Sequence, residues 1–172
     1  MQNFKIRPWK PEDLESLVKY ANNFRIAKNL TNKFPHPYTS RDGKAFIEFA
    51  SQNHPVQIFA IEIDGHAAGG IGIHPQEDIH AKNAELGYWL AEPFWSKGII
   101  SEAIKQMVDY AFRTFDIDRI FARPFGTNTA SQKVLEKNHF ILEGRFRNTL
   151  YKNGEYLDEL VYAFRKENWS NT

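Results

Sequence analysis

The residues best suited to chemistry surround a single glycine, Gly98. The segment Trp95-Ser96-Lys97-Gly98 follows a strand-like stretch and comes directly before a helix-like stretch that begins at Ile99. A loop that opens a helix presents backbone N–H groups without partners inside the helix, at the positive end of the helix dipole. This arrangement suits a phosphate or pyrophosphate, and a side chain at Gly98 would hold such a group away from the backbone. The same pattern is typical of an ordinary turn before a helix, so this segment alone leaves both interpretations open.

The elements that must position this loop are predicted from hydrophobic periodicity and turn residues. Asp64-Gly65 and Asn153-Gly154 are typical of two-residue hairpin turns. Hairpins in the first half, followed by strand–helix–strand units, predict an α/β fold with a mixed sheet and helices on both faces. The predicted strands cover residues 4–7, 56–63, 66–73, 83–90, 117–124, 140–146 and 156–164, and the predicted helices begin near residues 11, 40, 99 and 128.

Three details of the predicted helices and loops bear on the site. Ser40 is expected to cap the second helix, and Asn138 is expected to take the left-handed position that ends the last one. The segment 29–39 is a long loop in which Phe34 and Tyr38 either line a pocket or pin the loop to the body of the protein.

Composition limits the kinds of function. The 172 residues are expected to form one domain, 1–172, and 42% hydrophobic with 25% charged residues describes an ordinary globular chain. The formal net charge of +1 gives no electrostatic reason to expect nucleic acid or an anionic membrane as a partner. The lack of cysteine excludes disulfides, thiolate nucleophiles and cysteine-based zinc sites, and the six histidines show no metal-like spacing. No apolar stretch approaches the roughly 20 residues of a membrane span, so we expect a cytoplasmic protein without a metal.

The order of the chemical motifs resembles a known family. Along the chain come a strand, Trp95-Ser96-Lys97-Gly98, a helix, a strand, Asn128-x-x-Ser131, a helix, Asn138-His139-Phe140 and Glu143-Gly144. This order and spacing resemble the GCN5-related N-acetyltransferases (GNAT), and within them the ribosomal-protein N-terminal acetyltransferases, the RimJ/RimL-like branch. The resemblance covers nearly the whole chain, from the first strand to Phe164. It implies a mixed, mostly antiparallel sheet of about seven strands, whose fourth and fifth strands splay apart and admit acetyl-CoA.

The resemblance also implies a binding site for acetyl-CoA. Trp95 to Ile100 matches the pyrophosphate loop of the family, with Gly98 retained and Ile100 in the last position, where the family has glycine or alanine. Backbone N–H groups at the end of the preceding strand match those that bind the thioester oxygen; the ring of Trp89 is expected to serve mainly as a core aromatic, with which a backbone contact is compatible. The implied cofactor-binding residues are Trp89, Leu90, Ala91, Trp95, Ser96, Lys97, Gly98, Ile99, Ile100, Ser101, Asn128 and Ser131.

Two catalytic residues follow from the same correspondence. Glu85 stands ten residues before Trp95, where some members of the family carry a glutamate as general base; the alternative is a strand glutamate that faces water. Ser131 matches a serine proposed to protonate the departing thiolate, and its alternative role is to satisfy backbone donors in a first helical turn. Asn128 matches a residue that bonds the pantetheine arm but is equally suited to an N-cap. Leu150 stands where some relatives carry a glutamate, which leaves the acceptor open.

These observations together predict a cytoplasmic, acetyl-CoA-dependent N-acetyltransferase that transfers the acetyl group directly to a primary amine. The acceptor is a protein N-terminus, a polyamine, an amino acid or an antibiotic amine. Substrate choice is expected to depend on the first two helices, the loop 29–39 and the hairpin 148–156. The resemblance also admits a homodimer, because relatives often pair through sheet edges.

Two other functions would use the same loop. A non-catalytic module that binds acyl-CoA as a sensor needs the loop but neither Glu85 nor Ser131. A nucleotide-binding protein is less well supported, because the sequence contains neither a full Walker pattern nor GxGxxG.

Overall fold

The structure is a computed structural model, and it describes residues 3–169. Seven strands join in one sheet in the order β1-β2-β3-β4-β5-β7-β6. β4 and β5 pair in parallel, whereas β1 with β2, β2 with β3, β5 with β7 and β6 with β7 pair antiparallel. The predicted fold class, an α/β fold built on a mixed and mostly antiparallel sheet, is therefore confirmed.

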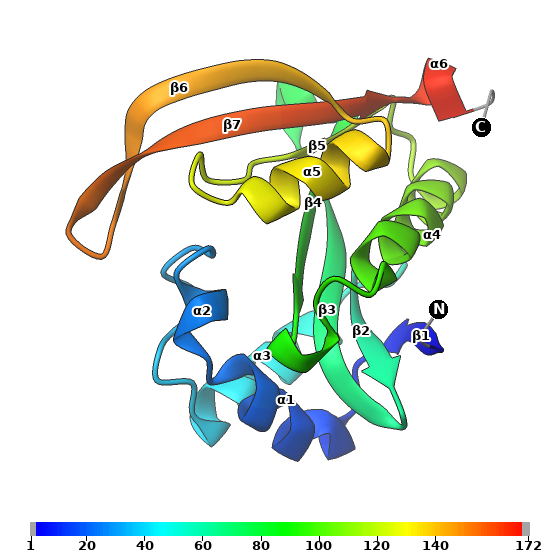
Figure 1. Cartoon of the computed structure of the whole chain (residues 1–172). Helices are drawn as coiled ribbons and strands as arrows, with labels where there is room; N and C mark the ends of the chain where they lie inside the picture. The colour runs from blue at the N-terminus through cyan, green and yellow to red at the C-terminus, as the bar shows by residue number, and fades with distance from the viewer. Residues whose placement is uncertain (1–2, 170–172) are drawn as a thin grey trace. The chain divides into compact units, whose positions relative to one another are not determined.

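The elements are labelled in Figure 1. The strands are β1 (Phe4–Pro8), β2 (Ile58–Ile63), β3 (His66–Pro75), β4 (Asn83–Leu90), β5 (Arg119–Ala122), β6 (Ile141–Lys152) and β7 (Glu155–Arg165). The helices are α1 (Leu14–Ala21), α2 (Phe24–Ala27), α3 (Ser40–Ala50), α4 (Ile99–Thr114), α5 (Thr129–Lys137) and α6 (Lys166–Trp169). Three short 3₁₀ turns are η1 (Pro11–Asp13), η2 (Asp78–His80) and η3 (Glu92–Phe94).

The chain divides into two compact units. Unit 1 consists of Met1–Gly72 with Tyr88–Ala103, and unit 2 consists of Ile73–Gly87 with Ile104–Thr172. Strands β3 and β4 and helix α4 pass from one unit into the other. The single domain expected over residues 1–172 stays a prediction.

Unit 1 is built around an apolar core between helices α1 and α3 and strands β2 and β3. Helix α1 contributes Leu17 and Ala21, both fully buried, from the apolar stripe at three- and four-residue spacing. Helix α3 begins with a capping box, in which the Thr39 hydroxyl accepts from the Asp42 N–H and the Asp42 carboxylate accepts from the Thr39 N–H. The expected cap at Ser40 is therefore wrong by one residue, because Thr39 has the extended backbone that a cap requires.

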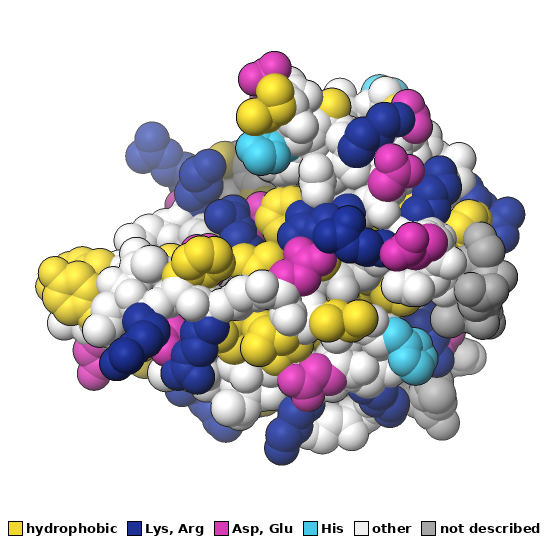
Figure 2. Space-filling view, turned by 90° about the horizontal axis from the view of Figure 1, so that it is seen from above, with side chains coloured by type: hydrophobic (Ala, Val, Ile, Leu, Met, Phe, Trp, Pro, Cys, Tyr) yellow, Lys and Arg dark blue, Asp and Glu magenta, His cyan; other side chains and the backbone are white. Residues whose placement is uncertain are grey.

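Unit 2 is dominated by the long antiparallel hairpin of β6 and β7, with α5 lying alongside β7 (Figure 1). The hairpin register shifts between Phe146 and Leu150, and Asn148 within that shift has φ +54°. Figure 2 views the molecule from above and shows hydrophobic side chains among charged ones on this face. The most exposed large hydrophobic side chains of the hairpin are Ile141, Leu142, Phe146, Tyr151 and Tyr156.

Two findings concern membranes and metals. Within residues 3–169, no helix is both long enough and apolar enough to cross a bilayer. In the same part of the chain, no three His, Cys, Asp or Glu side chains come together in a way that could hold a metal ion.

Candidate active site

The loop before α4 has the backbone geometry of an anion site. Ser96 and Gly98 have φ of +59° and +78°, and the Glu102 N–H donates the first helical bond to the Gly98 carbonyl at 3.1 Å. A positive φ favours glycine, and no atom lies within 4 Å of the position that a Cβ at Gly98 would occupy. The first N–H groups of the 16-residue helix α4 have no carbonyl partner inside it. The space beside the Gly98 Cα is therefore open, as the close approach of a phosphate to the backbone requires.

The first helical residues divide between the core and the surface. Ile99 is 1% exposed and anchors the start of α4, and Ser101 is also buried. Ile100, the departure from the family pattern, is half-buried, whereas Ser96 and Lys97 are exposed. The side chain of Ile100 therefore does not enter the core fully.

The strand end that precedes the loop contains the three N–H groups expected to bind an oxyanion, those of Trp89, Leu90 and Ala91. The Ala91 N–H donates to the Ala68 carbonyl of β3 at 2.8 Å, so it is already bonded. Successive N–H groups of an extended strand point to opposite edges, so the Leu90 N–H is directed away from β3.

The side chains around this strand end hold it firmly. The Trp95 indole N–H donates to the Leu90 carbonyl at 2.7 Å, which ties the first loop residue back to the strand. Trp89 packs against the unit 1 core, with its ring centroid 5.7 Å from that of Phe34. The core role of the Trp89 ring is thus observed, and Phe34 helps to pin the loop 29–39 to unit 1.

In unit 2, Glu85 forms a bidentate ion pair with Arg123, which was not predicted from the sequence. Arg123 Nε donates to Oε1 of Glu85 at 3.0 Å, and Arg123 Nη2 donates to Oε2 at 2.9 Å. The guanidinium also lies 3.6 Å from Oε1 of Glu159 on β7. The pair raises the pKa of Arg123, mainly through the hydrogen bond to Glu85. Glu85 is therefore neither a solitary strand glutamate facing water nor a buried unpaired acid; its side chain is 27% exposed.

The surroundings of Glu85 include His74 of β3 and the end of the pairing between β4 and β5. Burial lowers the pKa of His74 on β3, and the Glu85 carboxylate opposes that shift only in part. The parallel pairs of β4 with β5 described in unit 2 run from Asn83 with Arg119 to Glu85 with Phe121. Glu85 therefore lies in the last of these residue pairs. From there its side chain can reach Arg123, which follows the end of β5.

Arg123 was not predicted, although the sequence contains a signal for it. Arg119, Phe121 and Arg123 alternate along one face of β5 and the residue after its end, and Arg119 also binds acids, with Nη2 2.6 Å from Oε2 of Glu143. What the sequence could not give is the partner, because Glu85 is 38 residues away along the chain.

The start of α5 shows the capping role of Asn128. Its side-chain Oδ1 accepts from the Ser131 N–H at 3.2 Å, and Asn128 is the N-cap of the helix. Gln132 Nε2 donates to the carbonyls of Phe125 and Gly126 at 3.2 and 3.1 Å, which fixes the turn before the helix. The cap uses only the Asn128 oxygen, so a role of its amide group toward a ligand is compatible with this geometry.

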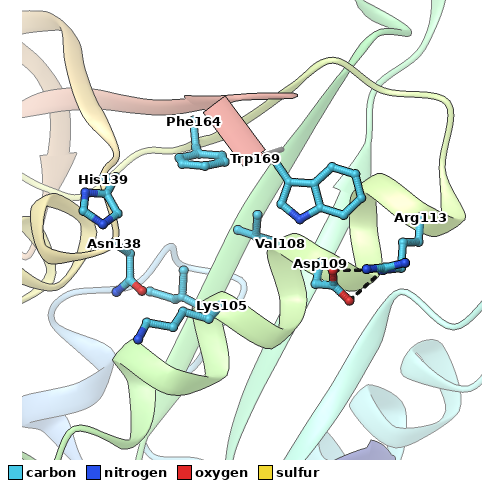
Figure 3. Close-up of a pocket in the computed structure, with 9 residues that line it drawn as sticks. Lys105, Val108, Asp109, Arg113, Asn138, His139, Phe164 and Trp169 are labelled. Carbon is cyan, nitrogen blue, oxygen red and sulfur yellow. Dashed lines mark hydrogen bonds and ion pairs between the residues drawn. The ribbon is translucent and has the colours of Figure 1, made fainter. Parts of the chain in front are cut away.

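A cavity of about 670 Å³ in unit 2 lies apart from the predicted residues (Figure 3). Helix α4 contributes Lys105, Val108 and Asp109 to its wall, and the end of the chain contributes Trp169. None of the predicted site residues lines it. The predicted site residues are therefore found elsewhere: the loop lies in unit 1, and Glu85, Asn128 and Ser131 lie in unit 2.

Comparison with known proteins decides the family. Residues 3–141 match the acetyltransferase (GNAT) domain. The chain belongs to the GNAT acetyltransferase family. The predicted family is thereby confirmed, and its members use acetyl-CoA as the acyl donor.

Individual relatives lie in the predicted branch. YdaF of Bacillus subtilis (strain 168), whose name as a ribosomal N-acetyltransferase is provisional, is 36% identical over 106 residues, 62% of this chain and 57% of YdaF. The ribosomal-protein-serine acetyltransferase of Escherichia coli (strain K12) is 31% identical over 107 residues, 62% of this chain and 59% of that protein. The chain thus spans little more than half of these relatives. The solved structure of RimL, a ribosomal L7/L12 alpha-N-protein acetyltransferase in complex with coenzyme A, is 26% identical with a TM-score of 0.83, covering 96% of this chain and 95% of that one.

Proposed function

We propose that the protein is an acetyl-CoA-dependent N-acetyltransferase that transfers the acetyl group directly to a primary amine. The observation that carries the proposal is the left-handed turn at Gly98, with open space above it, at the start of α4 within a matched acetyltransferase domain. The residues present fit acetyl-CoA, because the N–H groups that begin α4 suit its pyrophosphate and the Leu90 N–H suits its thioester oxygen. When bound, acetyl-CoA supplies the acyl group and a thiolate leaving group.

The residues of the chain have distinct tasks in this reaction. Glu85 accepts a proton from the acceptor ammonium, directly or through a water molecule, and so releases the amine that attacks the thioester carbonyl. The N–H of Leu90 donates to the oxygen as it gains negative charge. As the carbon–nitrogen bond forms, the carbon–sulfur bond breaks; the Ser131 hydroxyl gives its proton to the departing sulfur and regains one from the nitrogen, which loses it in becoming an amide. No covalent enzyme intermediate is needed, and the chain has no cysteine to form one.

Arg123 imposes a requirement on this mechanism. A carboxylate that accepts two hydrogen bonds from one guanidinium is fixed in its orientation. Each carboxylate oxygen has more than one lone pair, so Glu85 can accept a further bond from an ammonium while it stays paired. The ion pair with Arg123 is therefore compatible with the base role and orients the carboxylate.

The named relatives favour a protein N-terminus as the acceptor. The Escherichia coli relative is named as a ribosomal-protein-serine acetyltransferase, and RimL as an alpha-N-protein acetyltransferase. A small amine such as a polyamine is the alternative. A cytoplasmic location and a homodimer are further proposals that rest on the same family.

The test is turnover on a panel of amines. The purified protein is incubated with acetyl-CoA and, separately, with a peptide that has a free N-terminal serine, the same peptide with a blocked N-terminus, and spermidine. Release of free thiol with the free peptide only is the expected result. Thiol release with spermidine only would move the acceptor to the small amines, and binding of acetyl-CoA without turnover on any amine would favour the acyl-CoA sensor.

A further inference from the structure

A cluster of polar contacts in unit 1 joins helix α2 to the loop before α4. Glu92 of η3 accepts a hydrogen bond from Nδ2 of Asn23 at 2.8 Å and forms an ion pair with Nη1 of Arg25. Asn23 is also the N-cap of α2, since its Oδ1 accepts from the Arg25 N–H at 2.8 Å. One asparagine thus fixes both the start of α2 and the carboxylate that holds Arg25.

The guanidinium of Arg25 lies on the first residue of the loop. Its central carbon is 5.3 Å from the ring centroid of Trp95, within the range of a cation–π contact. The Trp95 indole N–H is bonded to the Leu90 carbonyl at 2.7 Å. The indole is thus held at its N–H by the end of β4 and on its face by a cation from α2.

A second set of contacts joins the end of α1 to η3, and η3 to the loop. The ring of Tyr20 meets that of Phe94 edge to face, with centroids 6.0 Å apart, and Nζ of Lys97 lies 5.3 Å from the Phe94 centroid. The end of α1 and the start of α2 therefore contact η3 and the loop through both apolar and charged groups.

We infer that Arg25 is a positioning residue for the loop Trp95–Gly98, and that it acts through Trp95 to hold the loop ready for the phosphates of acetyl-CoA. This inference rests on the proposed function. A loop that is ordered before binding loses less conformational entropy when the ligand binds, so fixing Trp95 should strengthen binding. The contact needs a flat cation that can stack on the ring and pair with Glu92 at once, which arginine provides and lysine does not.

Arg25 has one competing role, as a direct ligand of phosphate. Its side chain is 61% exposed, so a phosphate could reach it. Its charge, however, is already paired with Glu92, and its guanidinium is stacked on Trp95. The two roles differ in one respect: an effect transmitted through Trp95 disappears when Trp95 is absent, whereas a direct phosphate contact does not.

The experiment is a double-mutant cycle on coenzyme A binding, measured by calorimetry. The variants are Arg25→Gln, Trp95→Leu and the double variant, with Arg25→Lys to retain charge alone and Arg41→Gln, an exposed arginine of α3, as matched control. We expect Arg25→Gln to weaken binding about three- to tenfold, since an exposed ion pair and an exposed cation–π contact are each weak interactions. Arg25→Lys should not restore affinity, the Arg25→Gln change should have almost no effect in the Trp95→Leu background, and Arg41→Gln should bind normally.

Kinetics supply the second readout. Arg25→Gln should raise KM for acetyl-CoA and leave kcat almost unchanged, because the contact positions the loop and does not touch the reacting atoms. Three results would each overturn the inference while leaving the proposed function intact. They are an equal loss of coenzyme A affinity on Arg25→Gln with and without Trp95, full affinity in Arg25→Lys, and unchanged affinity in Arg25→Gln. Failure of the unaltered protein to bind coenzyme A would instead overturn the proposed function.

Two controls complete the experiment. Thermal unfolding without ligand checks that each variant is folded. Glu92→Gln, which releases the guanidinium of Arg25, should also weaken coenzyme A binding.

Discussion

The two groups of proposed site residues are held in place by different forces. In unit 1 the loop around Gly98 is set by backbone geometry, with positive φ at Ser96 and Gly98 and a buried Ile99 behind it. In unit 2 Glu85 is set by charge, through its ion pair with the 47%-exposed side chain of Arg123. The backbone geometry of the loop should change little with salt or pH, whereas the partly exposed ion pair of Glu85 and Arg123 should respond to both. Binding of the cosubstrate and proton transfer should therefore be separable by substitution and by pH.

The largest effect that would separate the two groups of residues is expected from removing the charge at Glu85. Glu85→Gln keeps the size of the side chain but cannot accept a proton, and a general base contributes about 10²–10⁴-fold to the rate. We expect kcat to fall at least about 10²-fold while the Kd for coenzyme A stays within about twofold. Steady-state kinetics and calorimetry measure the two quantities, with Glu77→Gln, an exposed acid of unit 2, as control. Unchanged turnover in Glu85→Gln would remove Glu85 from the mechanism.

The loop around Gly98 allows the opposite experiment, in which coenzyme A binding is weakened while the charge of Glu85 is kept. Gly98 and Gly65 have similar φ, +78° and +83°, and neither has an atom within 4 Å of an added Cβ. Gly98→Ala and Gly65→Ala should therefore carry the same backbone cost, about 1–2 kcal/mol, in thermal or urea unfolding. Only Gly98→Ala should weaken coenzyme A binding, by about tenfold, because its methyl group holds the phosphate off the backbone. Equal binding by the two variants would place the phosphate elsewhere.

A smaller effect is expected from the partner of Glu85. Three groups face this carboxylate: Arg123, the Glu159 carboxylate beyond it and His74 on β3. The two hydrogen bonds from Arg123 hold the Glu85 carboxylate in one orientation, so kcat/KM should fall in Arg123→Gln, by less than in Glu85→Gln, while the Kd for coenzyme A stays within about twofold. Arg113→Gln, which breaks an exposed ion pair of α4, serves as control, and an unchanged kcat/KM in Arg123→Gln would show that the ion pair does not position the base.

The smallest expected effect concerns a buried pair of unit 1 and separates stability from activity. Burial alone would raise the pKa of Asp13, but hydrogen bonds from Arg7 and from the Lys10 N–H lower it. A carboxyl whose pKa is lowered in the folded state stabilises the fold above its unfolded pKa, and this stabilisation is lost as the pH falls through the folded value. Urea unfolding between about pH 5 and pH 2 should show stability falling with pH less steeply in Asp13→Asn than in the unaltered protein. Parallel slopes would contradict the pairing, and Asp64→Asn serves as control.

The parts of the fold that were predicted correctly depend on local patterns. The strand over residues 83–90 has the predicted bounds, and helix α4 begins at Ile99 as predicted, because alternation and helical spacing are long and regular there. The short helix α2 was missed, since four residues give no periodic signal and depend on the cap at Asn23. Strand β6 runs on to Lys152 rather than ending at 146, because the bulge at Asn148 allows the hairpin to continue.

Other details depend on contacts that one segment cannot show. The left-handed position after α5 belongs to His139, with φ +62°, and not to Asn138, whose side chain is instead buried and bonds the Val134 carbonyl at 2.8 Å. The loop at Gly98 could be predicted because its chemistry lies in consecutive residues. Arg123 and Arg25 could not, because each acts on a partner that only the folded chain brings near.

The most direct test of the central claim asks whether the N–H groups that begin α4 bind phosphate. Amide signals of the ¹⁵N-labelled protein are recorded while coenzyme A is added, and again while pantetheine, which lacks the phosphates, is added. The account predicts large shifts of the Gly98, Ile99, Ile100 and Ser101 amides with coenzyme A and much smaller shifts of these amides with pantetheine. Binding of coenzyme A with these four amides unmoved would contradict it.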